Sequence, residues 1–159
     1  MTGADEKNDE RPTILIIEDG DEYLENLARF VPGPRYLQAH ATAGALGILA
    51  EHAVDMIYLD MRFDRVPLAD LVGDHARVTL EHNGDPVRAW RHLQNNQGLF
   101  ILDALRRAGH GDLPVILAYD FSREPRRFEH LLRAHPSLVW VPDSASPAEI
   151  RSLMDRQLG

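Results

Sequence analysis

Short apolar runs that end in carboxylates are the main pattern of this chain. The run 56–59 is followed at once by Asp60, and the run 14–17 is followed by Glu18 and Asp19. Apolar runs of this length, without polar alternation, are typical of strands buried on both faces. If the two strands are neighbours in a parallel sheet, the three carboxylates meet at its carboxyl edge, which is where functional groups collect.

Similar runs alternate with helical patterns along the rest of the chain. The predicted strands are 13–17, 36–41, 56–60, 114–118 and 138–141, and the predicted helices are 21–30, 43–53, 99–105, 125–132 and 147–158. Pro125 and Pro147 begin the last two helices, and Gly109 follows the third. Strands that alternate with helices need crossover connections, so the pattern predicts a parallel sheet.

Two stretches fall outside this alternation. Residues 1–11 are charged and have little to bury, which predicts a disordered acidic leader before a single domain at 12–159. Residues 63–97 contain prolines, glycines and scattered apolar side chains, which indicates an inserted loop or helical segment. Within this insert, Asp85 and Pro86 are suited to cap and begin a helix.

Composition narrows the classes of function. The chain has 25 acidic and 17 basic residues, a net charge of -8 and no long basic stripe, which argues against nucleic-acid binding. The absence of cysteine excludes disulfides and thiolate metal sites. No apolar run reaches membrane-spanning length and the start of the chain is polar, so we expect a cytoplasmic protein without a membrane anchor.

The order of elements, with these residues at the strand ends, resembles the receiver domain of two-component response regulators. Glu18 and Asp19 resemble the family's paired metal-binding acids, and Asp60 matches its phosphoacceptor aspartate. Segments 98–105 and 113–117 resemble its third helix and fourth strand. The resemblance implies a flavodoxin-like α/β fold: a five-stranded parallel sheet of order 2-1-3-4-5, helices on both faces, and a long insertion after the third strand.

The resemblance also implies a phosphoryl-transfer site, of which this chain holds one half. The three acids would hold Mg²⁺ while Asp60 accepts the phosphoryl group. Tyr119 and Val141 stand where the family has the Ser or Thr hydroxyl and the lysine that grip the phosphoryl oxygens. Without that lysine, repulsion among the acids should raise at least one pKa or demand a cation. Arg62 is a candidate partner for a phosphate or a carboxylate.

We interpret the chain as an atypical receiver-like signalling or adaptor module that acts through protein–protein contacts and is not an enzyme. The resemblance implies a protein partner, either a histidine kinase or a downstream effector, and a homodimer stays open. Because the sequence ends at Gly159 without an effector domain, we expect output through another protein unless this is one domain of a longer chain. The partner face that the resemblance implies comprises Phe128, Leu132, Trp140, Ile150 and Leu153.

Two alternatives remain at this point. One is a functional receiver, phosphorylated at Asp60 with Mg²⁺ as a step of a phosphorelay. The other is a Mg²⁺-dependent enzyme that uses Asp60 and Asp64, with the insert as a lid over the acidic pocket. The insert is also a candidate partner surface, through side chains such as Leu68 and Trp90.

Overall fold

A five-stranded parallel sheet forms the centre of the molecule, with strand order β2-β1-β3-β4-β5. The computed structural model describes residues 10–159, so most of the predicted leader, 1–11, lies outside the described residues. The strands are β1 (Thr13–Ile17), β2 (Arg35–Ala39), β3 (Met56–Asp60), β4 (Val115–Ala118) and β5 (Leu138–Val141). The predicted fold class and strand order are confirmed.

Burial explains why the strand patterns differ. Every residue of β1 and β4 is buried, because both are interior strands covered on two faces, and their sequences are correspondingly apolar. The edge strand β2 is mostly half-buried and therefore accommodates Arg35 and Gln38. It ends at Ala39, two residues before the predicted end, and His40 and Ala41 form the turn into the next helix.

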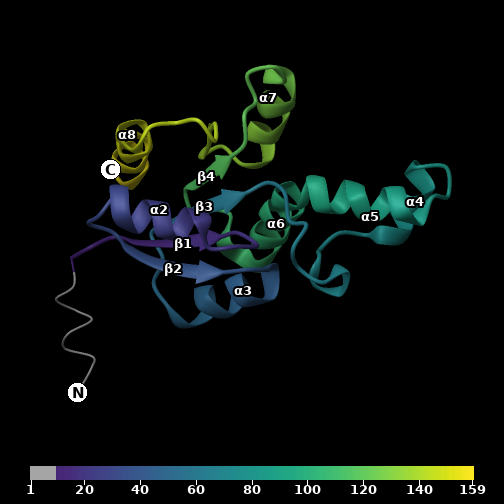
Figure 1. Ribbon diagram of the computed structural model, residues 1–159, viewed down its shortest axis with the longest axis horizontal. Helices are drawn as coiled ribbons and strands as arrows, with labels where there is room; N and C mark the ends of the chain where they lie inside the picture. The colour runs from purple at the N-terminus through teal and green to yellow at the C-terminus, as the bar shows by residue number, and fades with distance from the viewer. Residues whose placement is uncertain (1–9) are drawn as a thin grey trace.

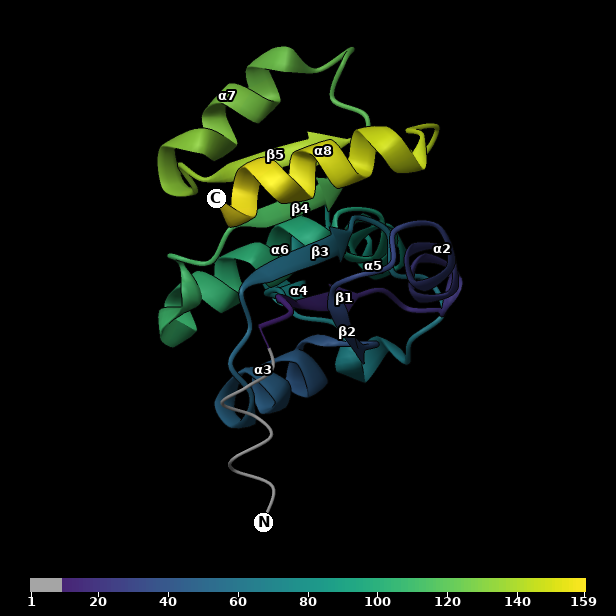
Figure 2. The ribbon, with the colours of Figure 1, turned by 90° about the vertical axis from the view of Figure 1, so that its left-hand side faces the viewer.

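Helices cover both faces of the sheet. They are α2 (Glu22–Phe30), α3 (Thr42–Glu51), α6 (Gln97–Leu105), α7 (Pro125–Ala134) and α8 (Pro147–Leu158). Side chains of α3, α6 and α7 pack in one core with Leu59 and Leu117, whereas α2 and α8 pack in the other with Ile16 and Tyr58. Figure 1 places α2 above β2 and α3 below it, and Figure 2 places α8 across β4 and β5. Among residues 10–159, no helix is long and apolar enough to span a membrane.

The insert folds as a helical hairpin. A short 3-10 turn, η1 (Leu68–Asp70), leads to α4 (His75–Glu81) and α5 (Pro86–Asn95). Asp85 caps α5 by accepting the N–H groups of Val87 and Arg88, as the Asp-Pro pair predicts. The two helices enclose a small core of Val78, Ala89 and Leu93. In Figure 1 the hairpin extends beyond α6, away from α2, α3 and α8.

Two adjacent residues join the hairpin to the sheet. The side chain of Gln97 is 1% exposed, and its amide both accepts from the N–H and donates to the carbonyl of Val72, at 2.7 and 3.0 Å. Gly98 follows at the start of α6, where an added Cβ would lie 2.5 Å from the carbonyl oxygen of Asp60. Only glycine allows this approach, so α6 packs directly on the end of β3. The helix ends in a wide turn, η2 (Arg106–His110), in which Gly109 has φ 93°.

Candidate functional site

Asp60 closes β3 at the carboxyl edge of the sheet, where it is partly buried. One carboxylate oxygen, Oδ1, accepts a hydrogen bond of 2.8 Å from the N–H of Met61. The pKa of Asp60 is raised to about 7, mainly by burial and to a smaller extent by the charges of Glu18, Asp19 and Asp143, against the opposing effect of that hydrogen bond. A large fraction of this carboxyl group is therefore protonated at neutral pH.

Glu18 follows β1 and is 3% exposed. Its Oε1 accepts the N–H of Tyr23 at 3.0 Å, which holds the carboxylate against the first turn of α2. Burial raises the pKa of Glu18 to about 7, while repulsion from Glu22 and Asp19 contributes less. The expected rise in pKa is present, but its main cause is removal from water rather than the missing lysine.

Asp19 is engaged by the first residues of the insert. Its Oδ2 accepts the backbone N–H groups of Asp64 and Arg65, both at 3.0 Å, and its Oδ1 lies 3.2 Å from Nη2 of Arg65. The same guanidinium pairs with Glu22 at 2.7 Å and lowers the pKa of that carboxyl to about 2. Asp19, whose side chain is 2% exposed, therefore anchors the loop after β3, and Arg65 supplies its counter-charge.

The arrangement of these acids does not fit a resident Mg²⁺ ion. Within residues 10–159 no group of three or more His, Asp or Glu side chains is placed to hold a metal. Both oxygens of Asp19 already accept protein donors, and Glu18 and Asp60 each accept one. The hairpin extends outward from the carboxyl edge of the sheet (Figure 1), and Asp64 meets Asp19 through its backbone N–H rather than its carboxylate. A lid over a metal site therefore finds no support here.

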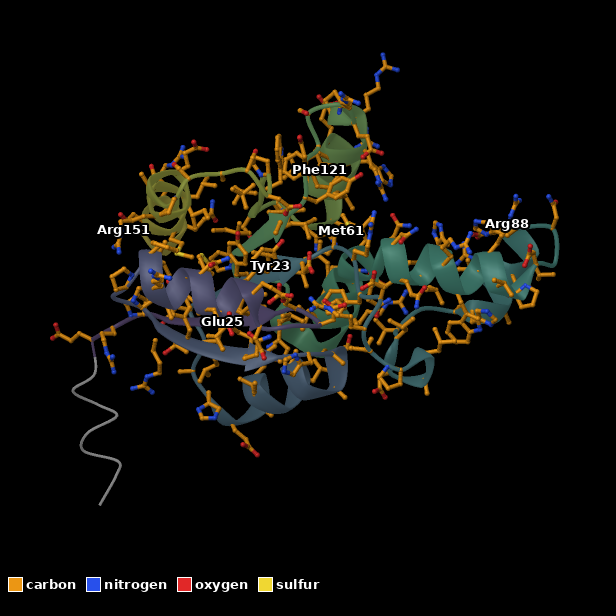
Figure 3. The ribbon with its side chains drawn as sticks, in the orientation of Figure 1. Tyr23, Glu25, Met61, Arg88, Phe121 and Arg151 are labelled. Carbon is orange, nitrogen blue, oxygen red and sulfur yellow. The ribbon has the colours of Figure 1, made fainter. Side chains whose placement is uncertain are left out.

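A fourth acid, which the sequence patterns did not single out, completes the site. Asp143 follows β5, and its Oδ1 accepts the hydroxyl of Tyr23 at 3.0 Å. The ring of Tyr23 meets that of Tyr58 edge to face, with centroids 5.3 Å apart. Figure 3 places Tyr23 and Met61 near the strand ends, whereas Arg88 on α5 lies at the far end of the hairpin. The signal was available, because Asp143 directly follows the Val-Pro pair at the family's lysine position.

The two tyrosines beside the acids are held in the protonated form. Burial raises the pKa of Tyr23 and of Tyr58, and the negative charges of Asp60 and Asp143 add to the rise in both. A neutral phenol can donate a hydrogen bond to a carboxylate, as Tyr23 does to Asp143, but it brings no positive charge. Tyr23 therefore satisfies an oxygen of Asp143 without neutralising its charge.

The switch-position residues stand at the same carboxyl edge as Asp60, because Asp60 pairs with Ala118 and Ala118 with Val141, but their side chains make other contacts. The hydroxyl of Tyr119 donates to Glu124, and its ring meets Phe121 edge to face at 4.6 Å, so the side chain is committed to the start of α7. Val141 is 2% exposed and packs in the core beneath α8. Arg62 is exposed and forms no ion pair with another described residue; the pairing near the acids is made by Arg65 instead. Sequence reasoning missed Arg65 because its contacts are long-range.

The predicted partner face is divided between the two cores. Phe128, Leu132 and Trp140 pack against the first core, whereas Ile150 and Leu153 pack against the second. All are partly rather than fully buried. Trp140 and Leu153 line one open hollow of about 470 Å³ between β5 and α8.

Comparison with known proteins identifies the fold. No protein-family model matches the sequence, and no curated protein does. A response regulator receiver domain from Clostridium thermocellum matches 92% of this chain and 94% of its own, with a TM-score of 0.59 and 13% identity. The signal receiver domain of a histidine kinase from Syntrophus aciditrophicus covers 92% and 89% of the two chains (TM-score 0.60, 17% identity), and the receiver domain of NtrX from Brucella abortus covers 91% and 97% (0.60, 15%).

At these identities the likeness establishes the fold and nothing finer. The chain therefore has the fold of a receiver domain, and its α4–α5 hairpin follows β3.

Proposed function

We propose that this chain is an atypical receiver-like module that signals through protein–protein contacts, with phosphorylation machinery too incomplete for Asp60 to serve as an acceptor. It performs no catalysis in this reading. Its partner is a protein, either a histidine kinase or a downstream effector.

The observation that carries the proposal is the charge around Asp60. Glu18, Asp19 and Asp143 all raise its pKa, and no described arginine forms an ion pair with it. Lys7 is the only lysine of the chain, so no lysine stands at the end of β5. Phosphoryl transfer needs positive charge on the transferred oxygens. The side chains beside Asp60 are acids and neutral phenols, and they do not supply this positive charge.

The position of Arg65 also supports the proposal that the phosphorylation machinery is incomplete. It lies across Asp19 and Glu22, where the family resemblance places a metal-binding acid, and so neutralises part of the acidic edge from within the protein. Arginine suits this role because its planar guanidinium forms several charge-assisted hydrogen bonds at once. The loop after β3 is then fixed without a bound cation or a phosphoryl group.

Treatment with acetyl phosphate and Mg²⁺, read by intact mass, tests the proposal. We expect no labile phosphate adduct on the wild-type chain. A conventional receiver treated in parallel verifies the reagent, and Asp60→Asn identifies the site of any adduct. An adduct on the wild type that disappears in Asp60→Asn would overturn the proposal in favour of a functional phosphoacceptor.

A second measurement addresses Arg65 directly. Removing the guanidinium in Arg65→Ala frees one oxygen of Asp19, so we expect this variant to bind Mg²⁺ more tightly than the wild type in calorimetric titration. Arg88→Ala, on the distant end of the hairpin, is the matched control and should bind as the wild type does. Equal Mg²⁺ affinity in wild type and Arg65→Ala would show that Arg65 does not compete with a cation.

The hollow between β5 and α8 is the proposed partner site. It presents the indole of Trp140 beside Leu153, a half-buried aromatic and an aliphatic side chain of the kind that anchors protein interfaces. Affinity purification from the native host should recover a partner with the wild type and with Arg91→Ala, and lose it with Trp140→Ala. Retention of that partner by Trp140→Ala would move the interface elsewhere, and light scattering of the purified chain tests the homodimer.

A further inference from the structure

A hollow of about 700 Å³ lies between the helical hairpin and α6. One wall is formed by α4 and the residues before it, and the other by α6 and the start of η2. The walls meet at Gly73, which has φ 125° and where an added Cβ would lie 2.5 Å from the side chain of Leu93 and 3.1 Å from that of Phe100. The hollow is therefore preformed, and its volume is that of a pocket for a small organic molecule.

Part of the lining carries no charge. Val72, Phe100 and Ala104 line the hollow and are partly exposed, and the buried Val78 lies beside them. His92 lines the same region, and its ring meets that of Phe100 edge to face with centroids 6.1 Å apart. The pKa of His92 is lowered, mainly by burial, so its imidazole is neutral at neutral pH. This part of the lining therefore suits an apolar body.

The wall formed by α4 has an excess of negative charge. Asp74 and Glu81 both line it, and Arg77 is the one cation among them. Nε of Arg77 lies 3.3 Å from Oε1 of Glu81, and the backbone N–H of Arg77 donates to Oδ1 of Asp74 at 3.1 Å. Oδ2 of Asp74 and Oε2 of Glu81 form no hydrogen bond with a described residue. Each carboxylate therefore keeps an acceptor atom for a ligand.

The wall formed by α6 and η2 has an excess of positive charge. Arg106 and Arg107 both pair with Asp103, at 2.6 and 2.9 Å, and occupy its two oxygens. Arg107 lines the hollow and pairs through Nε, so its two Nη groups have no acceptor among residues 10–159. A guanidinium with free Nη groups can bind a carboxylate through two parallel hydrogen bonds. The two walls therefore carry opposite net charge, to which a zwitterion is complementary.

We propose that this hollow binds a small zwitterion whose ammonium and carboxylate are separated by an apolar body, such as a short apolar peptide with free ends. The carboxylate pairs with Arg107, and the ammonium pairs with Asp74 and Glu81. The apolar body lies against the ring of Phe100. Exposed ion pairs contribute little stability, so a ligand can rearrange the pairs on both walls at small cost. The site is independent of the function proposed above, and the insert supplies one of its two walls.

Backbone NMR on the full chain tests the proposal with the dipeptide leucyl-phenylalanine, its N-acetyl form and its C-terminal amide. We expect saturable shifts in residues 72–81 and 100–107 with the free dipeptide. Each blocked form should bind about tenfold more weakly, because it lacks one of the two charges. Glycyl-glycine has both charges without the apolar body and should also bind more weakly. Absence of saturable shifts with the free dipeptide, or equal binding of all four probes, overturns the proposal.

Two variants on opposite walls test the orientation of the ligand. Arg107→Gln removes the partner of the carboxylate and should weaken binding of the free dipeptide about tenfold. Arg77→Gln is the matched control on the acidic wall, and it should bind at least as tightly as the wild type because the ammonium then meets less positive charge. Both arginines are exposed, so neither substitution disturbs the core. Equal loss of binding in the two variants would reduce the effect to non-specific attraction and overturn the proposed site.

Discussion

Glu18 and Asp60 are the residues whose chemistry the fold changes most. Each is a carboxyl group that burial at the sheet edge keeps from full ionisation near neutral pH. The guanidinium of Arg65, which pairs with Asp19 and Glu22, lowers the pKa of Glu18 only in part, and Asp60 forms no ion pair with a described residue. Such carboxyl groups oppose folding when charged, so they cost stability wherever they must ionise.

We predict that the free energy of unfolding falls as the pH rises from the ordinary pKa values of Glu18 and Asp60 to their values in the folded chain, about 7. Both groups have higher pKa values when folded, so between the ordinary values, 4.5 for Glu18 and 3.8 for Asp60, and about 7, the folded chain holds protons that the unfolded chain has released. Each proton contributes at most about 1.4 kcal/mol per pH unit, and the loss levels off above the folded pKa.

Urea unfolding from about pH 5 to about pH 8 measures this dependence. In Asp60→Asn one of the two groups is gone, so its stability should decline less steeply than that of the wild type. All other ionisable groups are common to both proteins, so the difference between the two curves isolates Asp60. Parallel curves would contradict the assigned pKa.

At the scale of elements, two features attach the hairpin to the rest of the fold: the hydrogen bonds of the Gln97 amide and the close packing of Gly98 on the backbone of Asp60. Gln97 satisfies the backbone of Val72 as a strand partner would, and Gly98 sets α6 on the end of β3. The hairpin's own core has only three buried residues, Val78, Ala89 and Leu93. Its order therefore depends on this attachment more than on its own packing.

Gln97→Leu should loosen the insert. The leucine fills a similar volume but leaves the N–H and carbonyl of Val72 unpaired, at a cost of about 1–3 kcal/mol for each orphaned group that stays buried. Hydrogen exchange followed by mass spectrometry should show that residues 71–95 of the variant exchange faster than in the wild type, while exchange in the strands is unchanged. Arg91→Ala, an exposed change on α5, is the control and should exchange as the wild type does. Uniform acceleration across the sheet would contradict a local role.

Across the whole molecule, the two tryptophans report on different parts. Trp90 packs against the hairpin core and stacks on His75 with centroids 3.8 Å apart, whereas Trp140 lies in β5 and meets Phe121. Phe121 is 1% exposed among the aromatic side chains of the first core. The arrangement makes the sheet and the hairpin separately observable by fluorescence.

Phe121→Ala should destabilise the whole fold by about 3–5 kcal/mol through the cavity it leaves. Because the hairpin rests on α6, the unfolding midpoints reported by Trp90 and by Trp140 should fall together in urea. Leu93→Ala removes a hairpin core residue instead, and should shift the Trp90 transition ahead of the Trp140 transition. The variants Trp140→Phe and Trp90→Phe each leave a single reporter. Coincident transitions in Leu93→Ala would mean that the hairpin has no independent unfolding.

The sequence by itself determined the strands, their parallel arrangement and the acids at their ends, whereas the strand order came from the resemblance to receiver domains. Periodicity and burial of the runs at 14–17 and 56–59 fix strand identity, and a parallel sheet then brings Glu18, Asp19 and Asp60 to one edge. The strands and their parallel arrangement follow from the local pattern and from the small set of allowed connections.

Only the tertiary structure decided how those acids are used. The pairing of Arg65 with Asp19 and the hydrogen bond from Tyr23 to Asp143 join residues far apart along the chain. The sequence also did not predict the direction in which the hairpin extends, because that direction depends on the close packing of Gly98 against the end of β3. Hydrophobic periodicity reports which face of an element is buried, but it does not report which polar side chains meet across elements.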